Sequence, residues 1–368
     1  MSVCAPGKEN NTHTCFSDKS LITIIQSYNK KYPNDKIMYS KAKFDREKAW
    51  NDIQKKLLRW TSGCDKDYCL LKTPLGDDIN DEEIHDKTFR PETPHSWKAN
   101  PTDWLSTLDI ANVINQYSEK YSDFHFIGPV PIDFDHKIAD VMCVSDELCK
   151  INLKRLYTNG TRRLGVVFNL DPHYADGSHW VSLFLNANTG GIYFFDSAGS
   201  SPPPQVRILM NRLKDQGNKM ILDKTIKLKT LDNIHKNVFT FEKVSNKKIK
   251  VINGKNIKNL YKNVICFTKG KLIVSLNYVK SIDGDIITLE NKVECEGCST
   301  FMSKCFKNFF NKKQLQFKNT ECGIFAINFT EEMLSGKRFD EIIADPYKND
   351  LFMIKKRKQY YRPHISHT

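Results

Sequence analysis

A histidine, an aspartate and a cysteine occupy positions from which they could form a hydrolytic site. His179 opens a strand-like run, Asp196 closes the next one, and the turn-forming segment 186–191 lies between them, which predicts a β-hairpin. Opposed residues should then have numbers that sum to roughly 376, so His179 and Asp196 should meet with Cβ atoms about 4.5–5.5 Å apart. A carboxylate bound to one ring nitrogen fixes the imidazole tautomer and leaves the other nitrogen to act as a base.

The matching nucleophile is Cys322, which directly precedes a segment apolar enough to be a buried helix. The partial positive charge of a helix N-terminus stabilises a thiolate, as does a neighbouring imidazolium. Gly323 would let a substrate backbone approach closely, and the Cys322 N–H with the Gln316 side-chain amide could bind an oxyanion. Two alternatives stay open, namely His173 as the base and Gln314 as the amide.

These motifs resemble those of the SUMO/ubiquitin-like-protein protease superfamily, which includes adenovirus protease. The resemblance rests on His179-Trp180, on an Asp seventeen residues later, and on Gln316 followed after five residues by Cys322-Gly323. Within the superfamily it points to the polyprotein-processing enzymes of African swine fever virus and related large DNA viruses. It implies an α+β, papain-like or adenain-like cysteine protease fold that needs no cofactor or metal.

The resemblance also assigns roles. It implies His179 as base, Asp196 as its orienting group, Cys322 as nucleophile and Gln316 in the oxyanion hole. Trp180 would gate a narrow channel for small residues, and Trp104 belongs to a Trp-Leu motif that opens the catalytic domain. Two departures are Glu321, where the family commonly has Asp before the Cys, and the long separation of Asp196 from Cys322.

The implied function is endopeptidase cleavage after Gly-Gly-type sequences in viral polyprotein or structural precursors during virion maturation. The implied location is the virion and the viral factory in the host cytoplasm. The alternatives are a SUMO or ubiquitin-like modifier deconjugating isopeptidase, and a basic virion protein associated with nucleic acid. Protein substrates are the expected partners, with nonspecific DNA binding as an addition and no membrane.

Local composition and the positions of proline and glycine predict four segments that position these residues. Residues 1–95 should be a mostly helical arm with an amphipathic helix at 47–60, and the acidic, proline-rich stretch 73–101 suits a linker or lid. Residues 96–223 and 312–368 should form the catalytic core, with helices after Ser106 and at 205–216. Residues 224–311 read as a lysine-rich β insertion, and the basic run 355–358 as a solvated tail.

Charge and cysteine content narrow the class of protein. With 56 Lys+Arg against 43 Asp+Glu the formal net charge is +13, which suits a polyanion partner or a solubility role. No run approaches the ~20 apolar residues of a membrane span, and the N-terminus has no apolar signal core, so an intracellular protein is expected. The 11 cysteines are then expected to be reduced thiols.

Zinc is a weaker alternative use of the cysteines. Cys295 and Cys298 have the two-residue spacing of a zinc knuckle, which Cys266 and Cys305 could complete. Cys64 and Cys69 have no such spacing and no expected role.

Overall fold

The computed structural model describes residues 3–9, 13–57, 66–139, 141–223, 225–226, 238–253, 257–260, 264–269, 272–302 and 305–364. It divides into two compact units that are described separately. The first comprises Met1–Tyr121, Gln316–Glu331 and Asp345–Thr368, and the second comprises Ser122–Leu315 and Glu332–Ala344.

The first unit is helical in its described part. Its α-helices are α1 (Asp18–Lys31), α2 (Arg46–Leu57), α3 (Pro74–Asp78), α4 (Glu82–His85), α5 (Thr107–Lys120), most of α9 (Cys322–Leu334) and α11 (Asp350–Tyr360). Two 3₁₀ helices, η1 (Asp67–Lys72) and η2 (His95–Lys98), complete it.

Local sequence explains where these helices begin. The Ser17 hydroxyl accepts the Ser20 N–H at the start of α1. Ser106 caps α5, the helix that the sequence predicted after this residue, and forms a capping box with Asp109. The predicted helix 47–60 corresponds to α2, and residues 58–60 lie outside the described residues. The apolar faces of α1 and α2 meet in one buried cluster around Phe16, Ile24 and Trp50.

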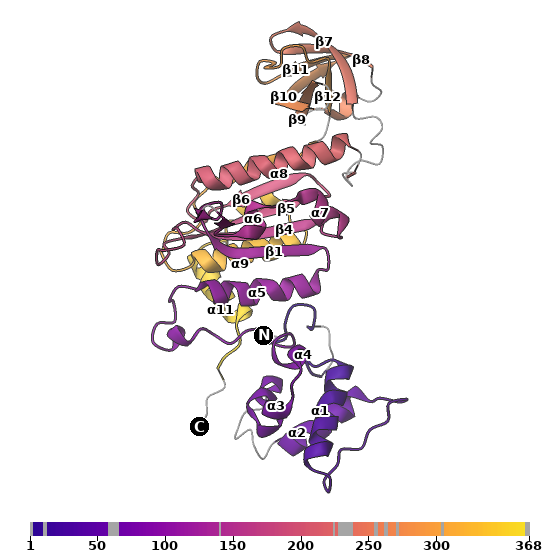
Figure 1. The fold of residues 1–368 in the computed structure, drawn as a ribbon, viewed down its shortest axis with the longest axis vertical. Coiled ribbons are helices and arrows are strands. Elements are labelled where there is room, and N and C mark those ends of the chain that lie inside the picture. The colour runs from indigo at the N-terminus through magenta and orange to yellow at the C-terminus, as the bar shows by residue number, and fades with distance from the viewer. Residues whose placement is uncertain are drawn as a thin grey trace. The chain divides into compact units, whose positions relative to one another are not determined.

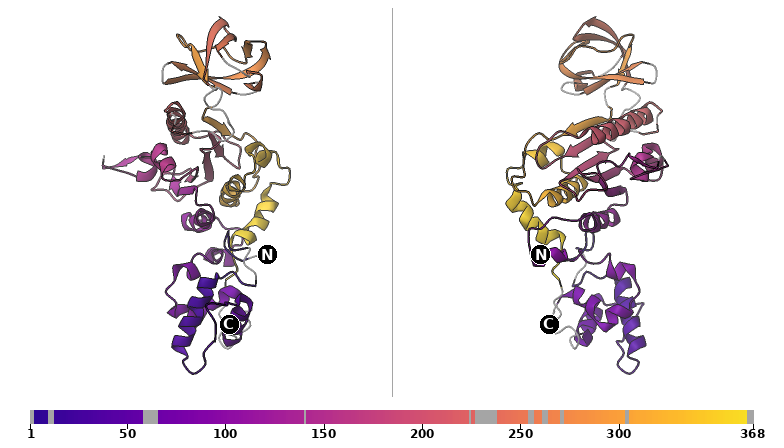
Figure 2. Two further views of the ribbon diagram at one scale, coloured as in Figure 1. Left: turned by 90° about the vertical axis from the view of Figure 1, so that its right-hand side faces the viewer. Right: turned by 60° about the vertical axis from the view of Figure 1, so that its left-hand side comes forward.

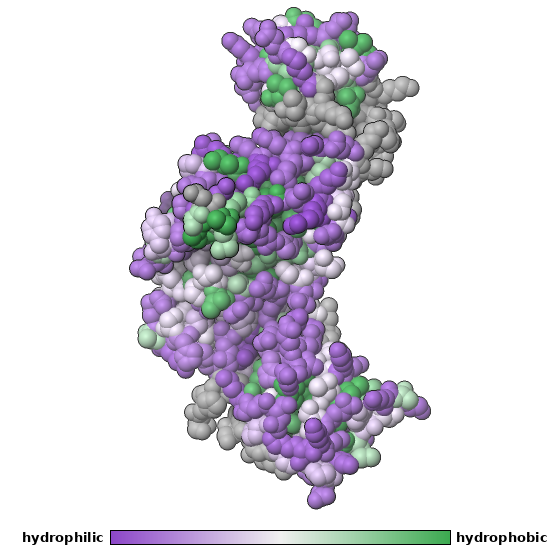
Figure 3. Space-filling model, viewed as in Figure 1, coloured by the Kyte–Doolittle hydropathy of each residue, from purple (hydrophilic) through white to green (hydrophobic). Residues whose placement is uncertain are grey.

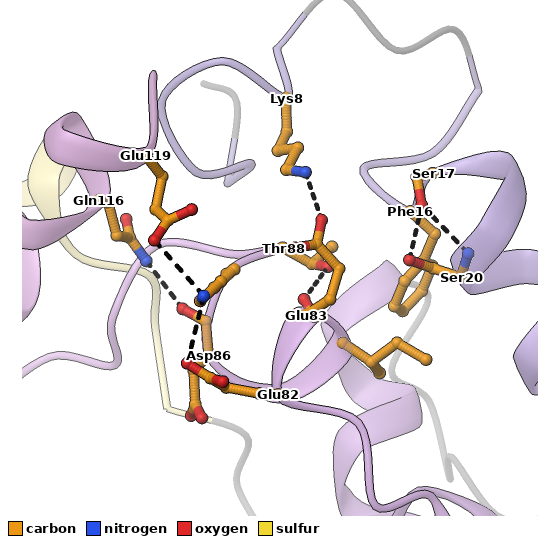
Figure 4. Close-up of polar contacts among 12 residues, drawn as sticks. Lys8, Phe16, Ser17, Ser20, Glu82, Glu83, Asp86, Thr88, Gln116 and Glu119 are labelled. Atoms are coloured by element: carbon orange, nitrogen blue, oxygen red, sulfur yellow. Dashed lines mark hydrogen bonds and ion pairs between the residues drawn. The ribbon is translucent and has the colours of Figure 1, made fainter. Parts of the chain in front are cut away.

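The stretch 73–101 is not the linker or lid that its composition suggested. Pro74 occupies the first turn of α3 and Asp81 caps α4, so these residues begin helical turns instead of preventing them. Leu75 and Ile84 are buried in the same core as α1 and α2. The stretch also binds α5, because Gln116 Nε2 donates to the Asp86 carbonyl at 3.3 Å (Figure 4) and to the Phe89 carbonyl at 2.7 Å.

The second unit contains a mixed five-stranded sheet in the order β1-β4-β5-β6-β13. Its strands are β1 (Phe124–Pro131), β4 (Arg163–Asn169), β5 (Trp180–Asn186), β6 (Gly191–Phe195) and β13 (Lys307–Phe310). The outer pairs β1–β4 and β6–β13 are parallel, and the inner pairs are antiparallel. The predicted hairpin is therefore the centre of this sheet (Figure 1).

Helices and a small hairpin accompany this sheet. They are α6 (Asp146–Cys149), α7 (Leu153–Thr158), α8 (Pro204–Leu222), α10 (Phe339–Ala344), the end of α9, and the pair β2 (Lys137–Ile138) and β3 (Met142–Cys143). α8 runs along the sheet (Figures 1 and 2) and buries Leu209 and Leu213 against Leu183 and Phe194. It extends beyond the predicted 205–216 to Leu222, and Gly217 lies within it against the Phe306 ring.

The lysine-rich segment forms a closed barrel in the order β10-β11-β8-β7-β12-β9. Its strands are β7 (Val238–Ser245), β8 (Lys248–Asn253), β9 (Val264–Lys269), β10 (Leu272–Asp283), β11 (Ile286–Leu289) and β12 (Thr300–Met302), with the 3₁₀ helix η4 (Ile257–Leu260). Phe239, Phe241, Phe267 and Phe301 fill its interior. The β character predicted for 224–311 is confirmed in the described residues.

The cysteines differ from the expectation of reduced thiols. Four disulfides join Cys4–Cys15, Cys143–Cys149, Cys266–Cys305 and Cys295–Cys298 in the described part of the chain, with Cα separations of 5.3–6.5 Å. Cys69 is also disulfide-bonded, and Cys64 lies outside the described residues. The four cysteines considered for zinc thus form two disulfides.

The described surface is predominantly hydrophilic on the face shown in Figure 3. Among the helices that the structure describes, none is long and apolar enough to span a bilayer.

Candidate active site

His179 and Asp196 are brought together as the hairpin predicted, although the register differs by about one residue. The ladder pairs Ser182 with Phe195 and Asn186 with Gly191, so paired numbers sum to 377. His179 and Asp196 lie just beyond its open end, where His179 Nε2 is 2.7 Å from Asp196 Oδ1. The Asp196 side chain is 2% exposed and that of His179 is 21% exposed. A buried carboxylate therefore orients a partly accessible imidazole.

Backbone amides hold the Asp196 carboxylate in place. The N–H of Ala198 donates to Oδ1 at 2.8 Å and that of Ser200 donates to Oδ2 at 3.2 Å. Burial raises the pKa of Asp196, but the hydrogen bond and charge of His179, with the Ala198 and Ser200 donors, outweigh it, so the pKa lies below its usual 3.8. Asp196 is thus ionised at neutral pH.

Asn311 fixes the Asp196 backbone, which sequence reasoning missed. Its Oδ1 accepts the Asp196 N–H at 2.9 Å and its Nδ2 donates to the Asp196 carbonyl at 2.6 Å. Asn311 is 1% exposed and directly follows β13. Asn311 and Asp196 are 115 residues apart, so no local sequence pattern predicts that they are hydrogen-bonded.

The loop after Asp196 is a tight turn that also receives the chain from β13. Gly199 has φ +79°, and a Cβ there would lie 2.8 Å from the Gln314 backbone nitrogen, so both conformation and space require glycine. The Leu315 N–H donates to the Ser197 carbonyl at 2.8 Å. The chain segment that leads to Gln316 is therefore anchored one residue after Asp196.

The alternative base His173 has a carboxylate partner of its own. His173 Nδ1 is 2.6 Å from Asp133 Oδ2, and the backbone N–H of His173 donates to Oδ1 of the same carboxylate. Asp133 is more exposed than Asp196, at 19% against 2%. The two His–Asp pairs differ in their carboxylates, because Asp196 is buried and accepts two backbone N–H groups, whereas Asp133 is partly exposed and accepts that of His173.

Cys322 and Gln316 belong to the first unit. Cys322 is the free cysteine of the described residues, is 2% exposed and is the first residue of α9. The Phe325 N–H donates to the Glu321 carbonyl at 2.9 Å, so Glu321 occupies the N-cap position directly before Cys322. The residues of α9 that follow, including Ile324 and Phe325, are buried as predicted.

Gly323 and the Trp104 segment are neighbours within the first unit. A Cβ on Gly323 would lie 3.1 Å from Leu105 Cβ, so the missing side chain serves the packing of α9 against the residue before the α5 cap. Close packing against Leu105 therefore explains why residue 323 is glycine. Contact of Gly323 with substrate stays a prediction. Trp104, next to Leu105, is 39% exposed.

The two candidate amides differ in burial. Gln316 is 6% exposed, and its Nε2 donates to the Lys318 carbonyl at 2.5 Å, whereas Gln314 is exposed. This contrast favours Gln316 as the ordered amide. Trp180, the first residue of β5 in the second unit, is 6% exposed.

Comparisons with known proteins agree with these features. No protein-family model matches the chain. The chain is 32% identical over 217 residues to a putative thiol protease of Acanthamoeba polyphaga mimivirus, covering 55% of this chain and 68% of that protein. It is 28% identical over 200 residues to the SUMO-1 cysteine protease of African swine fever virus, covering 50% and 71%.

A solved structure has the same fold. The crystal structure of the African swine fever virus protease matches 99% of this chain and 96% of its own, with a TM-score of 0.54 at 16% identity. The chain therefore belongs to the SUMO protease-like superfamily of cysteine proteases, together with enzymes of large DNA viruses. The chain is thus a cysteine protease with an α+β fold.

Proposed function

We propose that the chain cleaves peptide bonds with Cys322 as nucleophile, His179 as general base and acid, and Asp196 as the group that orients the imidazole. The observation that carries this proposal is the 2.7 Å bond between His179 Nε2 and the buried, amide-bound Asp196. With Nε2 bound to the carboxylate, the proposal assigns proton exchange with the thiol to Nδ1. Cys322, the first residue of α9, supplies the thiol.

Chain connectivity supports placing Gln316 in the same site. Leu315 is hydrogen-bonded to Ser197, and Gln316 is the next residue along the chain. The bond from Gln316 Nε2 to the Lys318 carbonyl orients the side-chain amide. The NH₂ group has a second hydrogen, which the proposal assigns, with the Cys322 N–H, to the oxyanion of the tetrahedral intermediate.

The reaction follows from these roles. The Cys322 thiolate attacks the scissile carbonyl, and the oxyanion is held by the Gln316 and Cys322 donors. The His179 imidazolium then gives its proton to the leaving amine, which leaves a thioester on Cys322. Water, deprotonated by His179, hydrolyses the thioester and regenerates the thiol. No cofactor takes part in these steps.

The proposed cleavage sites are of the Gly-Gly type. A narrow channel gated by Trp180 would accept only a chain without Cβ atoms next to the scissile bond. Gly323 and Trp104 are the other two residues proposed to bind substrate. The exposure of Trp104 and its position next to Leu105, which packs on Gly323, support its role in substrate binding.

The proposed substrates are viral polyprotein or structural precursors, cut during virion maturation in the virion and the host cytoplasm. The viral origin of the relatives supports this choice. A second candidate is removal of a SUMO-like modifier, because the African swine fever virus relative is named a SUMO-1 cysteine protease. Nonspecific DNA is proposed as an additional partner on account of the +13 charge.

The test uses a precursor fragment that contains Gly-Gly-x beside a SUMO fusion, with products assigned by mass spectrometry. We expect cleavage of the precursor after Gly-Gly, loss of cleavage in Cys322→Ala and His179→Ala, and a reduced rate in Gln316→Ala. His173→Ala and Gln314→Ala are the matched controls and should cleave normally. Unchanged cleavage by Cys322→Ala would refute the mechanism, and cleavage of the fusion alone would favour the modifier-removing function.

A further inference from the structure

The residue before Cys322 forms an ion pair that is removed from solvent. Glu321 is completely buried, and its Oε2 accepts a hydrogen bond from Arg357 Nε at 2.7 Å. Arg357 comes from α11 and is 2% exposed. The basic run 355–358 is therefore no solvated tail, because it lies within a helix that turns Arg357 inward while Lys355 and Lys358 stay exposed.

The Arg357 guanidinium joins three segments of the first unit. Its Nη2 donates to the carbonyls of Thr320 at 2.7 Å and Thr102 at 3.2 Å, and its Nη1 donates to the Asp103 carbonyl at 2.8 Å. The Trp97 ring lies 4.4 Å from the Arg357 Cζ. One side chain thus connects α11, the residues before α5 and the residues before Cys322.

Such an arrangement requires arginine and a carboxylate. A buried charge is costly unless it is paired and hydrogen-bonded, and here bonds from three guanidinium nitrogens meet that need. The planar fork reaches four oxygens at fixed angles, which a lysine ammonium would not reproduce. The Glu321 Oε1 also accepts the Thr320 hydroxyl at 3.0 Å, so both carboxylate oxygens are bound.

These bonds act on the peptide that carries the nucleophile. The Glu321 carbonyl receives the first helical hydrogen bond of α9, from Phe325. Arg357 holds the Thr320 carbonyl and the Glu321 side chain at the same time. Hydrogen bonds therefore restrain the backbone before Cys322 at the Thr320 carbonyl, the Glu321 side chain and the Glu321 carbonyl. These restraints fix the direction of the Cys322 N–H and of the Cys322 Cα–Cβ bond.

We propose that Glu321 and Arg357 are positioning residues that hold Cys322 and its backbone N–H in the reactive arrangement. This inference rests on the proposed role of Cys322 as nucleophile. Neither residue touches substrate; both act through the N-terminal turn of α9. A misplacement of the reacting atoms by about 1 Å can cost on the order of 100-fold in rate, so loosening this turn should lower turnover more than substrate binding.

The test compares Glu321→Gln, Glu321→Asp and Arg357→Lys with a matched control, all in the 368-residue chain. The control is Lys356→Met, which removes the 3.1 Å ion pair of Lys356 with Glu331 between the same two helices, ten residues further along the chain from Glu321. The measured quantities are kcat and KM on a Gly-Gly-x peptide, the rate of Cys322 alkylation by iodoacetamide across pH, and the unfolding midpoint in urea.

We expect Glu321→Gln and Arg357→Lys to lower kcat and the alkylation rate by about tenfold or more, with KM within about twofold. Glu321→Asp should recover part of the loss because it keeps the charge. Lys356→Met should lower the unfolding midpoint without changing alkylation. The proposal is overturned if the positioning variants change kcat and alkylation no more than Lys356→Met does at equal loss of stability.

Two results keep this proposal separate from the proposed function. If Cys322→Ala still cleaves the peptide, the nucleophile assignment fails and the positioning role fails with it. If Cys322→Ala is inactive while Arg357→Lys is fully active, only the positioning role fails. Should Arg357→Lys not fold, Glu321→Asp, which retains a carboxylate toward Arg357, tests the positioning role by itself. A kcat and a Cys322 alkylation rate below those of the wild type support the role, and unchanged values overturn it.

Discussion

At the scale of the residue, the proposed mechanism depends on the contact between His179 and Asp196, because a carboxylate bound to one ring nitrogen fixes the tautomer of the imidazole. The carboxylate is buried, bound by the Ala198 and Ser200 amides, and 2.7 Å from the imidazole. A comparable contact between His173 and Asp133 is more exposed. Burial of the carboxylate thus separates the two pairs more clearly than their His–Asp distances of 2.7 and 2.6 Å do.

The lowered pKa of Asp196 predicts a pH dependence of stability. The unfolded carboxyl binds protons more readily than the folded one, so the stabilisation is complete above its usual pKa of 3.8 and is lost as pH falls through the lower folded-state value. Urea unfolding between about pH 6 and 3 should therefore show a steeper acid loss in the wild type than in Asp196→Asn. Equal slopes would contradict this assignment.

Asn311 provides a second prediction at this scale. Asn311→Ala removes the bonds to the Asp196 backbone and leaves buried groups unpaired, which costs about 1–3 kcal/mol. We expect a lower kcat with little change in KM, measured on the Gly-Gly-x peptide. Asn308→Ala is the control and should leave kcat unchanged, because Asn308 lies on β13, three residues before Asn311, and its side chain binds the exposed Asn211.

At the scale of the element, the sequence predicted what depends on local pattern. The Ser106 cap, the hairpin strands and the buried start of α9 follow from spacing and residue type, and they match the structure. The His179–Asp196 contact follows from the same logic. The Arg357–Glu321 pair and the Asn311–Asp196 bonds do not, because they join residues 36 and 115 positions apart.

The errors have physical causes of the same kind. The basic run 355–358 was predicted to be solvated because it is charged, yet Arg357 is buried and paired with Glu321. The stretch 73–101 was predicted to be a linker or lid because it is rich in proline, yet Pro74 begins a helix. The disulfides require knowledge of which cysteines approach within bonding distance, and spacing does not supply it.

Gly217 in α8 allows a prediction in which two effects oppose each other. Glycine to alanine within a helix usually stabilises by about 1 kcal/mol. Here an added Cβ would lie 2.6 Å from Phe306 Cδ1 and nearer still to its Cγ, so the buried ring must move. We expect Gly217→Ala to destabilise the protein by about 1–3 kcal/mol in urea unfolding. A stabilised variant would show that the ring adjusts without cost.

At the scale of the whole molecule, the six-stranded barrel is an insertion with its own core. Its first and last strands pair, with Val238 opposite Met302, so its ends lie about 5 Å apart. Replacing residues 238–302 with a short Gly-Ser linker, together with Cys305→Ser, should leave a folded enzyme. Cleavage of the Gly-Gly-x peptide should stay within about twofold of the wild type.

The same variant tests the charge argument. If the lysines of the barrel bind DNA, its removal should weaken DNA affinity and reduce the salt dependence of binding. Fluorescence anisotropy with a short duplex at several salt concentrations measures both. Unchanged DNA affinity would assign the basic charge to the remaining chain or to solubility, and lost peptidase activity would make the barrel part of the catalytic machinery.

The most direct test of the central claim is the reactivity of Cys322 toward iodoacetamide at about pH 6, where an ordinary thiol is almost entirely protonated. Mass spectrometry assigns the labelled residue in the wild type, in His179→Ala and in His173→Ala. We expect fast, selective labelling of Cys322 that His179→Ala slows by about tenfold or more and His173→Ala leaves unchanged. Labelling of Cys322 at the rate of an ordinary thiol, or without any effect of His179→Ala, would contradict the thiolate–imidazole pair.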